Sequence, residues 1–192
     1  MNIDYLSVSW ETYHDLVRKI SASILSHSPY VNQIVAISRG GLTFGHLCSD
    51  FLRIPIATMA IQSYSEIQKH GAVTITEPLK TDVRGKHVLL VDDVADSGKT
   101  LKRATSYVKS FGPKSVTVAT MFYKPRSVFR PDYFAKQTNK WILFPYEPTE
   151  MILLITKSME KEGKTKSEIQ SFLYSLGYTI PYIRHVRKYF LS

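Results

Sequence analysis

The stretch from Val88 to Thr100, VLLVDDVADSGKT, constrains the fold of this chain more than any other part of the sequence. It begins with an unbroken run of Val and Leu, which is typical of a central parallel strand buried on both faces of a sheet. Two adjacent acids and a loop of small residues follow, and then Leu101, Ala104 and Val108 recur at helical spacing. The stretch therefore predicts a strand–loop–helix unit with two carboxylates at the carboxyl end of the strand.

The loop in this unit has the chemistry of a phosphate site. Backbone N–H groups bind anions where a loop enters the N-terminus of a helix, and Ser97 and Thr100 add hydroxyl donors. Gly98 allows the backbone to approach the anion closely. Asp92 and Asp93 can accept hydrogen bonds from two neighbouring sugar hydroxyls, or hold the waters around a Mg²⁺ ion. The stretch therefore suits a ligand that carries a phosphate group and a pair of hydroxyls.

A P-loop nucleotide hydrolase is the first alternative, because the GKT at residues 98–100 matches the end of a Walker A motif. In the motif G-x-x-x-x-G-K-[ST] the first glycine would be residue 93, and Asp93 stands there instead. No other glycine-rich loop in the sequence supplies the motif. A simple Asp-rich turn that caps a helix explains Asp96 or Ser97, but it does not explain two acids behind a buried strand.

The chain on either side alternates between helix and strand patterns. Apolar residues at helical spacing behind Ser9 predict a helix over residues 10–26, and a second helical pattern continues to about residue 52. Short apolar runs predict strands at QIVAIS, ATMAIQSY, AVTITEPL, SVTVATMFY and KWILFPY, and KPRSVFRPDYF is expected to form a loop. This alternation predicts an α/β fold with a mostly parallel, twisted sheet flanked by helices, which binds ligands at the carboxyl ends of its strands.

The segment that begins at about residue 148 has a different character. Its helical patterns lie at residues 149–161, 167–176 and 181–191. Thr165 and Glu168 have the spacing of a capping box, which marks the start of the second of these helices. We therefore expect one domain over residues 1–147 and an appended three-helix extension over residues 148–192.

Composition narrows the cellular setting. The net charge of +9 predicts a surface that attracts anions, which include nucleic acids, acidic membranes and polyphosphate substrates. The single cysteine, Cys48, cannot form an intramolecular disulfide, which is typical of a reducing compartment. No apolar stretch approaches the roughly 18 residues of a membrane span, and the first residues do not have the pattern of a signal peptide. We expect a cytoplasmic protein without a membrane partner.

The stretch VLLVDDVADSGKT closely resembles the motif with which type I phosphoribosyltransferases bind 5-phosphoribosyl-1-diphosphate (PRPP). Residues 8–147 resemble the purine-salvage branch of that family, particularly the 6-oxopurine enzymes. AISRGGL resembles their diphosphate loop, QSY their flexible hood, and FYKP with WILFPY their base-binding strand and loop. The resemblance implies the type I fold with a hood over about residues 62–78, a homodimer, and Mg²⁺-dependent conversion of a purine base and PRPP into a nucleoside 5′-monophosphate and diphosphate.

The resemblance also implies a role for each matching residue. The ribose and the 5′-phosphate of PRPP would be bound by Asp92, Asp93, Ala95, Asp96, Ser97, Gly98, Lys99 and Thr100. Diphosphate would be bound by Ser38, Arg39 and Gly40, the purine by Lys124, Trp141 and Ile142, and the hood would include Ser63 and Tyr64. Asp92 and Asp93 would hold Mg²⁺ through water, and Asp96 would face purine N7 as the catalytic acid–base group. Without the resemblance, Arg39 is typical of a strand-ending turn and Lys124 of a surface loop, whereas Trp141 suits core packing and stacking on a ligand equally.

The identity of the base is less constrained. Lysine donates hydrogen bonds and cannot accept them, so Lys124 favours the O6 acceptor of hypoxanthine, guanine or xanthine. Adenine is the alternative, with the backbone near Ile142 accepting from its amino group. Tyr146 stands where many 6-oxopurine enzymes have Trp.

A regulator that senses PRPP and binds nucleic acid is a more distant alternative. Residues 151–192 contain seven Lys and Arg against three Glu, and three short helices can form a helix-turn-helix. However, residues 180–190 mix these cations with many apolar side chains, which favours docking onto the core or a partner subunit. We therefore expect small-molecule substrates as the partners of this protein, and not nucleic acid.

Overall fold

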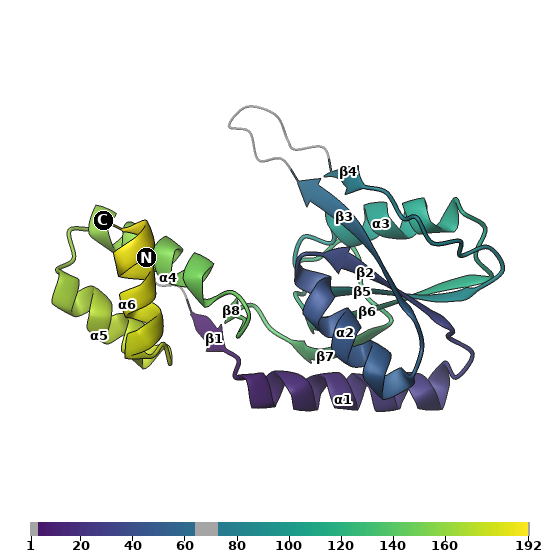
Figure 1. Ribbon diagram of the computed structural model, residues 1–192, viewed down its shortest axis with the longest axis horizontal. Helices are drawn as coiled ribbons and strands as arrows, with labels where there is room; N and C mark the ends of the chain where they lie inside the picture. Colours follow the sequence, from purple (N-terminus) through teal and green to yellow (C-terminus); the bar gives the residue numbers. More distant parts are fainter. Residues whose placement is uncertain (1–3, 64–72, 192) are drawn as a thin grey trace. The chain divides into compact units, whose positions relative to one another are not determined.

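The computed structural model describes residues 4–63 and 73–191, and it divides the chain into two compact units. One unit is formed by residues 14–139, and the other by residues 1–13 together with residues 140–192. The strands are β1 (Tyr5–Ser7), β2 (Gln33–Ser38), β3 (Ile56–Ser63), β4 (Val73–Glu77), β5 (His87–Ala95), β6 (Ser115–Tyr123), β7 (Tyr133–Gln137) and β8 (Trp141–Leu143). The helices are α1 (Trp10–His27), α2 (Gly40–Leu52), α3 (Lys99–Lys109), α4 (Pro148–Lys161), α5 (Lys166–Ser175) and α6 (Ile180–Phe190) (Figure 1). No helix in the described ranges is long and apolar enough to cross a bilayer.

The unit of residues 14–139 is built on a sheet that, within the described residues, has the strand order β4-β3-β2-β5-β6-β7. Its strands pair in parallel from β3 to β7, and only β4 runs antiparallel to its neighbour. The strand β5 is central and almost entirely buried, as its unbroken Val and Leu run predicts. The expected α/β fold with a mostly parallel sheet is confirmed.

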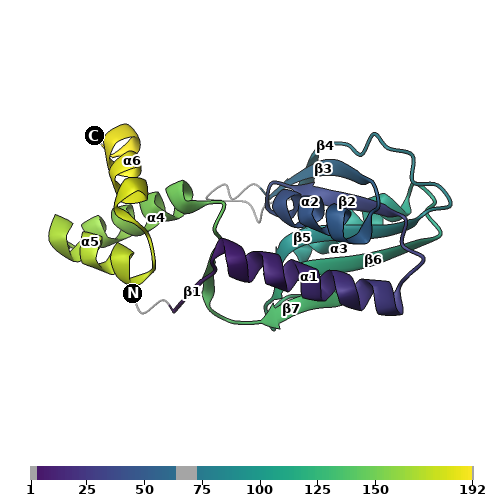
Figure 2. The same ribbon diagram turned by 60° about the horizontal axis from the view of Figure 1, so that its bottom comes forward.

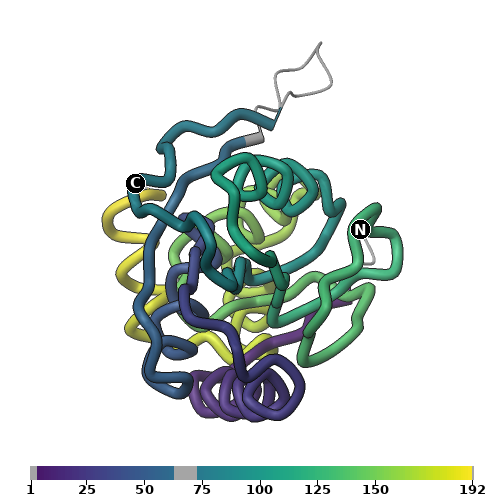
Figure 3. Tube along the Cα trace, turned by 90° about the vertical axis from the view of Figure 1, so that its right-hand side faces the viewer, coloured from purple at the N-terminus to yellow at the C-terminus, as the bar shows by residue number. Residues whose placement is uncertain are grey.

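Helices cover both faces of this sheet. Residues 14–27 of α1 and the helix α2 lie on one face, and α3 lies on the other (Figures 1 and 3). On the first face, α1 contacts α2 through a hydrogen bond of 3.5 Å between Ser21 Oγ and Cys48 Sγ. On the second face, Leu101 and Val108 of α3 join Val88 and the other inward residues of the sheet in one apolar core. Cys48 is fully buried, and this burial raises the pKa of its thiol to about 11.

Two strands differ from the sequence prediction. Residues 133–137 form β7, although its first two residues, Tyr133 and Phe134, were expected to belong to the loop KPRSVFRPDYF and the other three were assigned to no element. The strand is held by its partner: Asp132 N donates to Val118 O at 2.9 Å, and Asp132 Oδ2 accepts from Val118 N at 2.7 Å. The strand in KWILFPY is shorter than expected, and it pairs in parallel with β1 instead of joining the main sheet. The strands β1 and β8 have three residues each. A strand this short is too short for the alternation of apolar and polar residues that marks a strand in a sequence.

The unit of residues 1–13 and 140–192 has an apolar core of its own. Leu143 of β8 belongs to one apolar cluster with buried residues of all three C-terminal helices, including Ile152, Leu173 and Val186. Figure 2 shows the helices of this cluster, α4, α5 and α6, grouped together. The three expected helices are present, and the capping box of Thr165 and Glu168 is formed. The domain boundary expected after residue 147 stays a prediction, since this compact unit also takes in β1 and β8.

Candidate active site

The two acids that the sequence places after a buried strand lie at the carboxyl end of β5. Asp92 is 9% exposed, and its Oδ1 accepts a hydrogen bond from the backbone N–H of Asp93 at 3.0 Å. Burial raises the pKa of Asp92 well above its ordinary range, and the adjacent charge of Asp93 raises it further. The backbone N–H groups of Asp93 and Gly41 act in the opposite direction. A buried acid beside a second acid is a site that a cation or several hydrogen-bond donors would stabilise.

The loop after β2 meets this acid pair. A Cβ atom added at Gly40 would lie 2.2 Å from Asp93 Oδ2, and one added at Gly41 would lie 2.5 Å from the backbone oxygen of Val91. The neighbour of Gly41 is backbone, so only glycine fits there, whereas a side chain at residue 40 would displace the Asp93 carboxylate. The peptide bond between Ser38 and Arg39 is cis, and α2 begins at Gly40. The predicted diphosphate loop and the predicted ribose-binding acids are therefore neighbours at one edge of the sheet.

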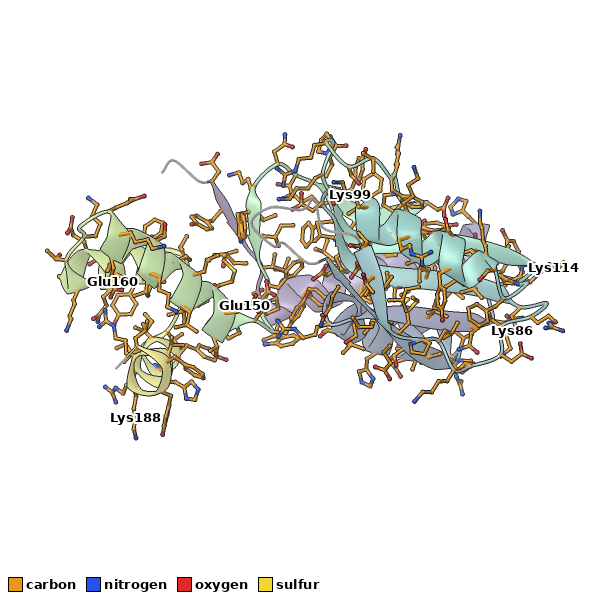
Figure 4. The ribbon with its side chains drawn as sticks, turned by 90° about the horizontal axis from the view of Figure 1, so that it is seen from above. Lys86, Lys99, Lys114, Glu150, Glu160 and Lys188 are labelled. Carbon is orange, nitrogen blue, oxygen red and sulfur yellow. The ribbon has the colours of Figure 1, made fainter. Side chains whose placement is uncertain are left out.

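The predicted phosphate loop runs from Ala95 into α3. Gly98 has φ +76°, a left-handed conformation that favours glycine, and α3 begins at the next residue. A Cβ atom at Gly98 would also lie 2.4 Å from Ser127 Oγ and 2.6 Å from the backbone N of Phe129. The backbone N–H groups at the start of α3 have the arrangement of an anion site. The Lys99 side chain is exposed at that end of α3, whereas Lys86 and Lys114 lie toward the other end (Figure 4).

Asp96 lies between two cations. Its Oδ2 is 3.7 Å from Nζ of Lys124, whose side chain is almost fully buried. Its Oδ1 accepts hydrogen bonds from Nε of Arg126 at 2.8 Å and from Nη2 of the same guanidinium. The backbone N–H of Lys124 donates to Ala95 O at 3.0 Å, which ties the end of β6 to the phosphate loop. A surface-loop position for Lys124 is thus excluded, and the structure brings Lys124 and Asp96 together.

Four predicted residues remain, Trp141 and Ile142 for base binding and Ser63 and Tyr64 for the hood. Trp141 and Ile142 belong to β8, in the unit of residues 1–13 and 140–192, and Trp141 is 43% exposed while Ile142 is buried. Ser63 is the last residue of β3. Tyr64 and most of the predicted hood lie outside the described residues. The roles of these four residues in base binding and in the hood stay predictions.

Two residues of the site, Gly41 and Arg126, are not among those that the sequence predicts. Gly41 belongs to a Gly-Gly pair, and its need for close approach to Val91 depends on how α2 packs on β5. Arg126 is one of two arginines in the Pro- and Arg-rich loop KPRSVFRPDYF, and the residue types around them do not distinguish the two. Its position, two residues after Lys124, is the one signal that it lies near the site.

The fold and this site define a phosphoribosyltransferase, and comparison with known families agrees. Residues 9–150 match the family described as "Phosphoribosyl transferase domain". Because this match covers well over half of the chain, the chain belongs to the phosphoribosyltransferase family. It is therefore a pentosyltransferase enzyme that acts on small molecules, and the resemblance drawn from VLLVDDVADSGKT is confirmed.

Two curated relatives illustrate its place in the family. A xanthine-guanine phosphoribosyltransferase of Idiomarina loihiensis is 29% identical over 143 residues, which are 73% of this chain and 85% of the relative. A hypoxanthine-guanine phosphoribosyltransferase of Mycobacterium tuberculosis is 36% identical over 101 residues, which are 50% of this chain and 48% of the relative. The chain thus spans about half the length of the second relative.

Solved structures extend the likeness to the fold. A purine phosphoribosyltransferase from Pyrococcus horikoshii superimposes with a TM-score of 0.69 at 31% identity, covering 76% of this chain and 95% of that one. The xanthine-guanine-hypoxanthine phosphoribosyltransferase of Helicobacter pylori has a TM-score of 0.68 at 23% identity, covering 78% of this chain and 97% of that one. The second structure shares the fold with this chain.

Proposed function

We propose that this protein transfers the ribose 5-phosphate of PRPP to a 6-oxopurine base and releases diphosphate. The observation that carries the proposal is the pair of Lys124 and Asp96, in which a hydrogen-bond donor lies 3.7 Å from a carboxylate acceptor. The O6 and N7 atoms of a 6-oxopurine are neighbours on one edge of the ring. When N7 carries the proton, that edge offers an acceptor beside a donor, which Lys124 and Asp96 complement.

Adenine is the less favoured base on the same chemistry. Its 6-amino group is a donor, and it would face the ammonium group of Lys124, which is also a donor. The names of the two curated relatives support the 6-oxopurine choice, since they are a xanthine-guanine and a hypoxanthine-guanine phosphoribosyltransferase. We propose hypoxanthine, guanine and xanthine as the bases, with Trp141 stacking on the ring and the Ile142 backbone at its edge.

The reaction separates charge, and the site has groups for both halves. As the bond between ribose C1 and the diphosphate oxygen breaks, its electron pair leaves with the diphosphate, and positive charge develops on the ribose. Arg39, Ser38 and the first N–H groups of α2 would stabilise the leaving diphosphate. Asp92 and Asp93 would bind the ribose hydroxyls, and residues 95–100 would hold the 5′-phosphate. Fixing both ends of PRPP orients C1 toward the base.

Asp96 would take the proton that the base loses. The N9 nitrogen of the purine forms the new bond to ribose C1 with its lone pair, and the proton on N7 moves to or toward the Asp96 carboxylate. This is general base catalysis, typically worth about 10²–10⁴-fold in rate. Asp96 is 43% exposed in its side chain, so the side chain is not sealed off from a ligand.

Magnesium fits the acid pair. Mg²⁺ prefers oxygen ligands and keeps several waters, and two adjacent carboxylates supply suitable acceptors. Asp92 and Asp93 would hold the ion through these waters. When bound, the ion would neutralise charge on the diphosphate oxygens.

We also propose a homodimer and a cytoplasmic location, as expected from the sequence.

The test of this function is a substrate panel. Purified protein is incubated with PRPP, Mg²⁺ and one of hypoxanthine, guanine, xanthine, adenine, uracil or orotate, and diphosphate release is measured. We expect turnover with at least one 6-oxopurine and little with adenine or the pyrimidines. Turnover confined to adenine would assign Lys124 another role, and the absence of turnover with every base would overturn the proposal.

A further inference from the structure

The two carboxylate oxygens of Asp96 have different partners. Both contacts from Arg126, through Nε and Nη2, fall on Oδ1. The other oxygen, Oδ2, is the one that lies 3.7 Å from Lys124 Nζ. One end of the carboxylate is thus held by a rigid guanidinium plane, and the other end is turned toward the lysine.

The segment that holds Arg126 is fastened to the loop that holds Asp96. Lys124 N donates to Ala95 O at 3.0 Å, and Val128 N donates to Ser97 O at 3.0 Å. The two bonds flank Arg126 in the segment that follows β6, and they flank Asp96 in the loop that follows β5. The backbones of the two residues are therefore fixed relative to each other, although the Arg126 side chain is 66% exposed.

We propose that Arg126 is a positioning residue of the transfer reaction, which holds the Asp96 carboxylate so that Oδ2 and Lys124 Nζ meet the N7 and O6 edge of the base together. This inference rests on the proposed function of Asp96 and Lys124. An Asp side chain without such a contact samples several rotamers, and in most of them Oδ2 no longer lies beside Lys124. An exposed ion pair contributes little to stability, so the effect of Arg126 is expected on the base step and not on folding.

The first experiment compares Arg126→Ala with Arg126→Lys and with a matched control. Arg130→Ala is the control, because Arg130 is exposed in the same loop and its guanidinium lies over the ring of Phe134 instead of Asp96. We expect Arg126→Ala to lower kcat/KM for the purine by about tenfold, as misplacement of a reacting group does, with KM for PRPP unchanged. Arg126→Lys should recover part of the loss, and Arg130→Ala should match the wild type.

The second experiment is a double-mutant cycle with Asp96→Asn. If Arg126 acts through Asp96, Arg126→Ala causes no further loss in the Asp96→Asn background. Equal losses in both backgrounds, or equal losses for purine and PRPP, would overturn the positioning role. Wild-type activity in Arg126→Ala would also overturn it while leaving the proposed function intact. Wild-type activity in Asp96→Asn would instead refute the catalytic role on which the inference rests. Thermal unfolding checks that each variant folds, and Arg126→Lys and Arg126→Gln replace the alanine variant if it does not.

Discussion

At the scale of single residues, Asp92 and Arg39 illustrate two different contributions to the site. Asp92 is buried beside Asp93, and its raised pKa shows that its ionised form is disfavoured in the folded protein. Arg39 is exposed at the N-cap of α2, in the loop that meets the acid pair. Each of these two residues can be tested separately from the base-binding groups.

Asp92→Asn should stabilise the free protein at neutral pH. The amide keeps the acceptor for the N–H of Asp93 and removes a buried charge, and the gain should be about 0.5–2 kcal/mol. For an acid whose pKa is raised on folding, the cost appears as pH rises above the unfolded value and is absent at lower pH. The stability difference between variant and wild type should therefore shrink below about pH 4. Chemical denaturation across pH measures this, and a difference that does not vary with pH would contradict it. Affinity for PRPP should fall.

Arg39→Ala should weaken PRPP and diphosphate far more than the nucleoside monophosphate, because the monophosphate has no diphosphate to contact. Charge-assisted hydrogen bonds of this kind are worth roughly 1.5–3 kcal/mol, or more than tenfold in affinity. Calorimetry with the three ligands gives the comparison. Equal loss of affinity for all of them would mean that Arg39 is structural.

At the scale of elements, the site depends on how loops meet. The predicted phosphate loop is covered by the segment of residues 127–129. Gly98 is therefore required for two reasons, which are this contact and the left-handed backbone conformation. In the predicted diphosphate loop, Gly40 similarly approaches Asp93 closely.

Gly98→Ala and Gly85→Ala separate the effect of a left-handed backbone from the effect of contact with residues 127–129. Both glycines have similar φ, +76° and +70°, but a Cβ at Gly85 would meet nothing within 4 Å. Both variants should lose about 1 kcal/mol of stability from backbone strain. Gly98→Ala should lose more than Gly85→Ala, because its Cβ would also clash with Ser127 and Phe129. Only Gly98→Ala should also raise KM for PRPP, by at least about tenfold, because its Cβ would displace the segment that covers the phosphate loop. An unchanged KM for PRPP in Gly98→Ala would contradict this account.

At the scale of the whole molecule, the C-terminal helices share a core with the strand that carries Trp141 and Ile142. Leu143 of β8 packs in the apolar cluster that Ile152 and Leu173 also join. Fully burying each such side chain is worth roughly 1.5–3 kcal/mol, so these helices stabilise the strand. The extension is thus expected to support base binding.

Deleting residues 150–192 should raise the apparent KM for the purine more than that for PRPP. Leu173→Ala is the milder test, since Leu173 is fully buried and its truncation should cost about 2–5 kcal/mol. Leu154→Ala is its control, because Leu154 is 51% exposed on α4. Steady-state kinetics with both substrates provide the measurement. A truncated protein that folds and keeps both constants would show that the helices are independent of catalysis, and would favour the nucleic-acid alternative.

The sequence by itself determined the central strand, the turn at Gly98 into α3 and the helices of the extension. Their signals are local: the Val and Leu run before Asp92, the glycine before α3, and the capping box at Thr165 act on neighbouring residues. Only the tertiary structure decided that β8 pairs with β1, that Lys124 is buried against Asp96, and that Arg126 holds the other carboxylate oxygen. These features join residues about 30 or more positions apart, and which long side chain reaches which partner depends on how β5, β6 and their loops pack.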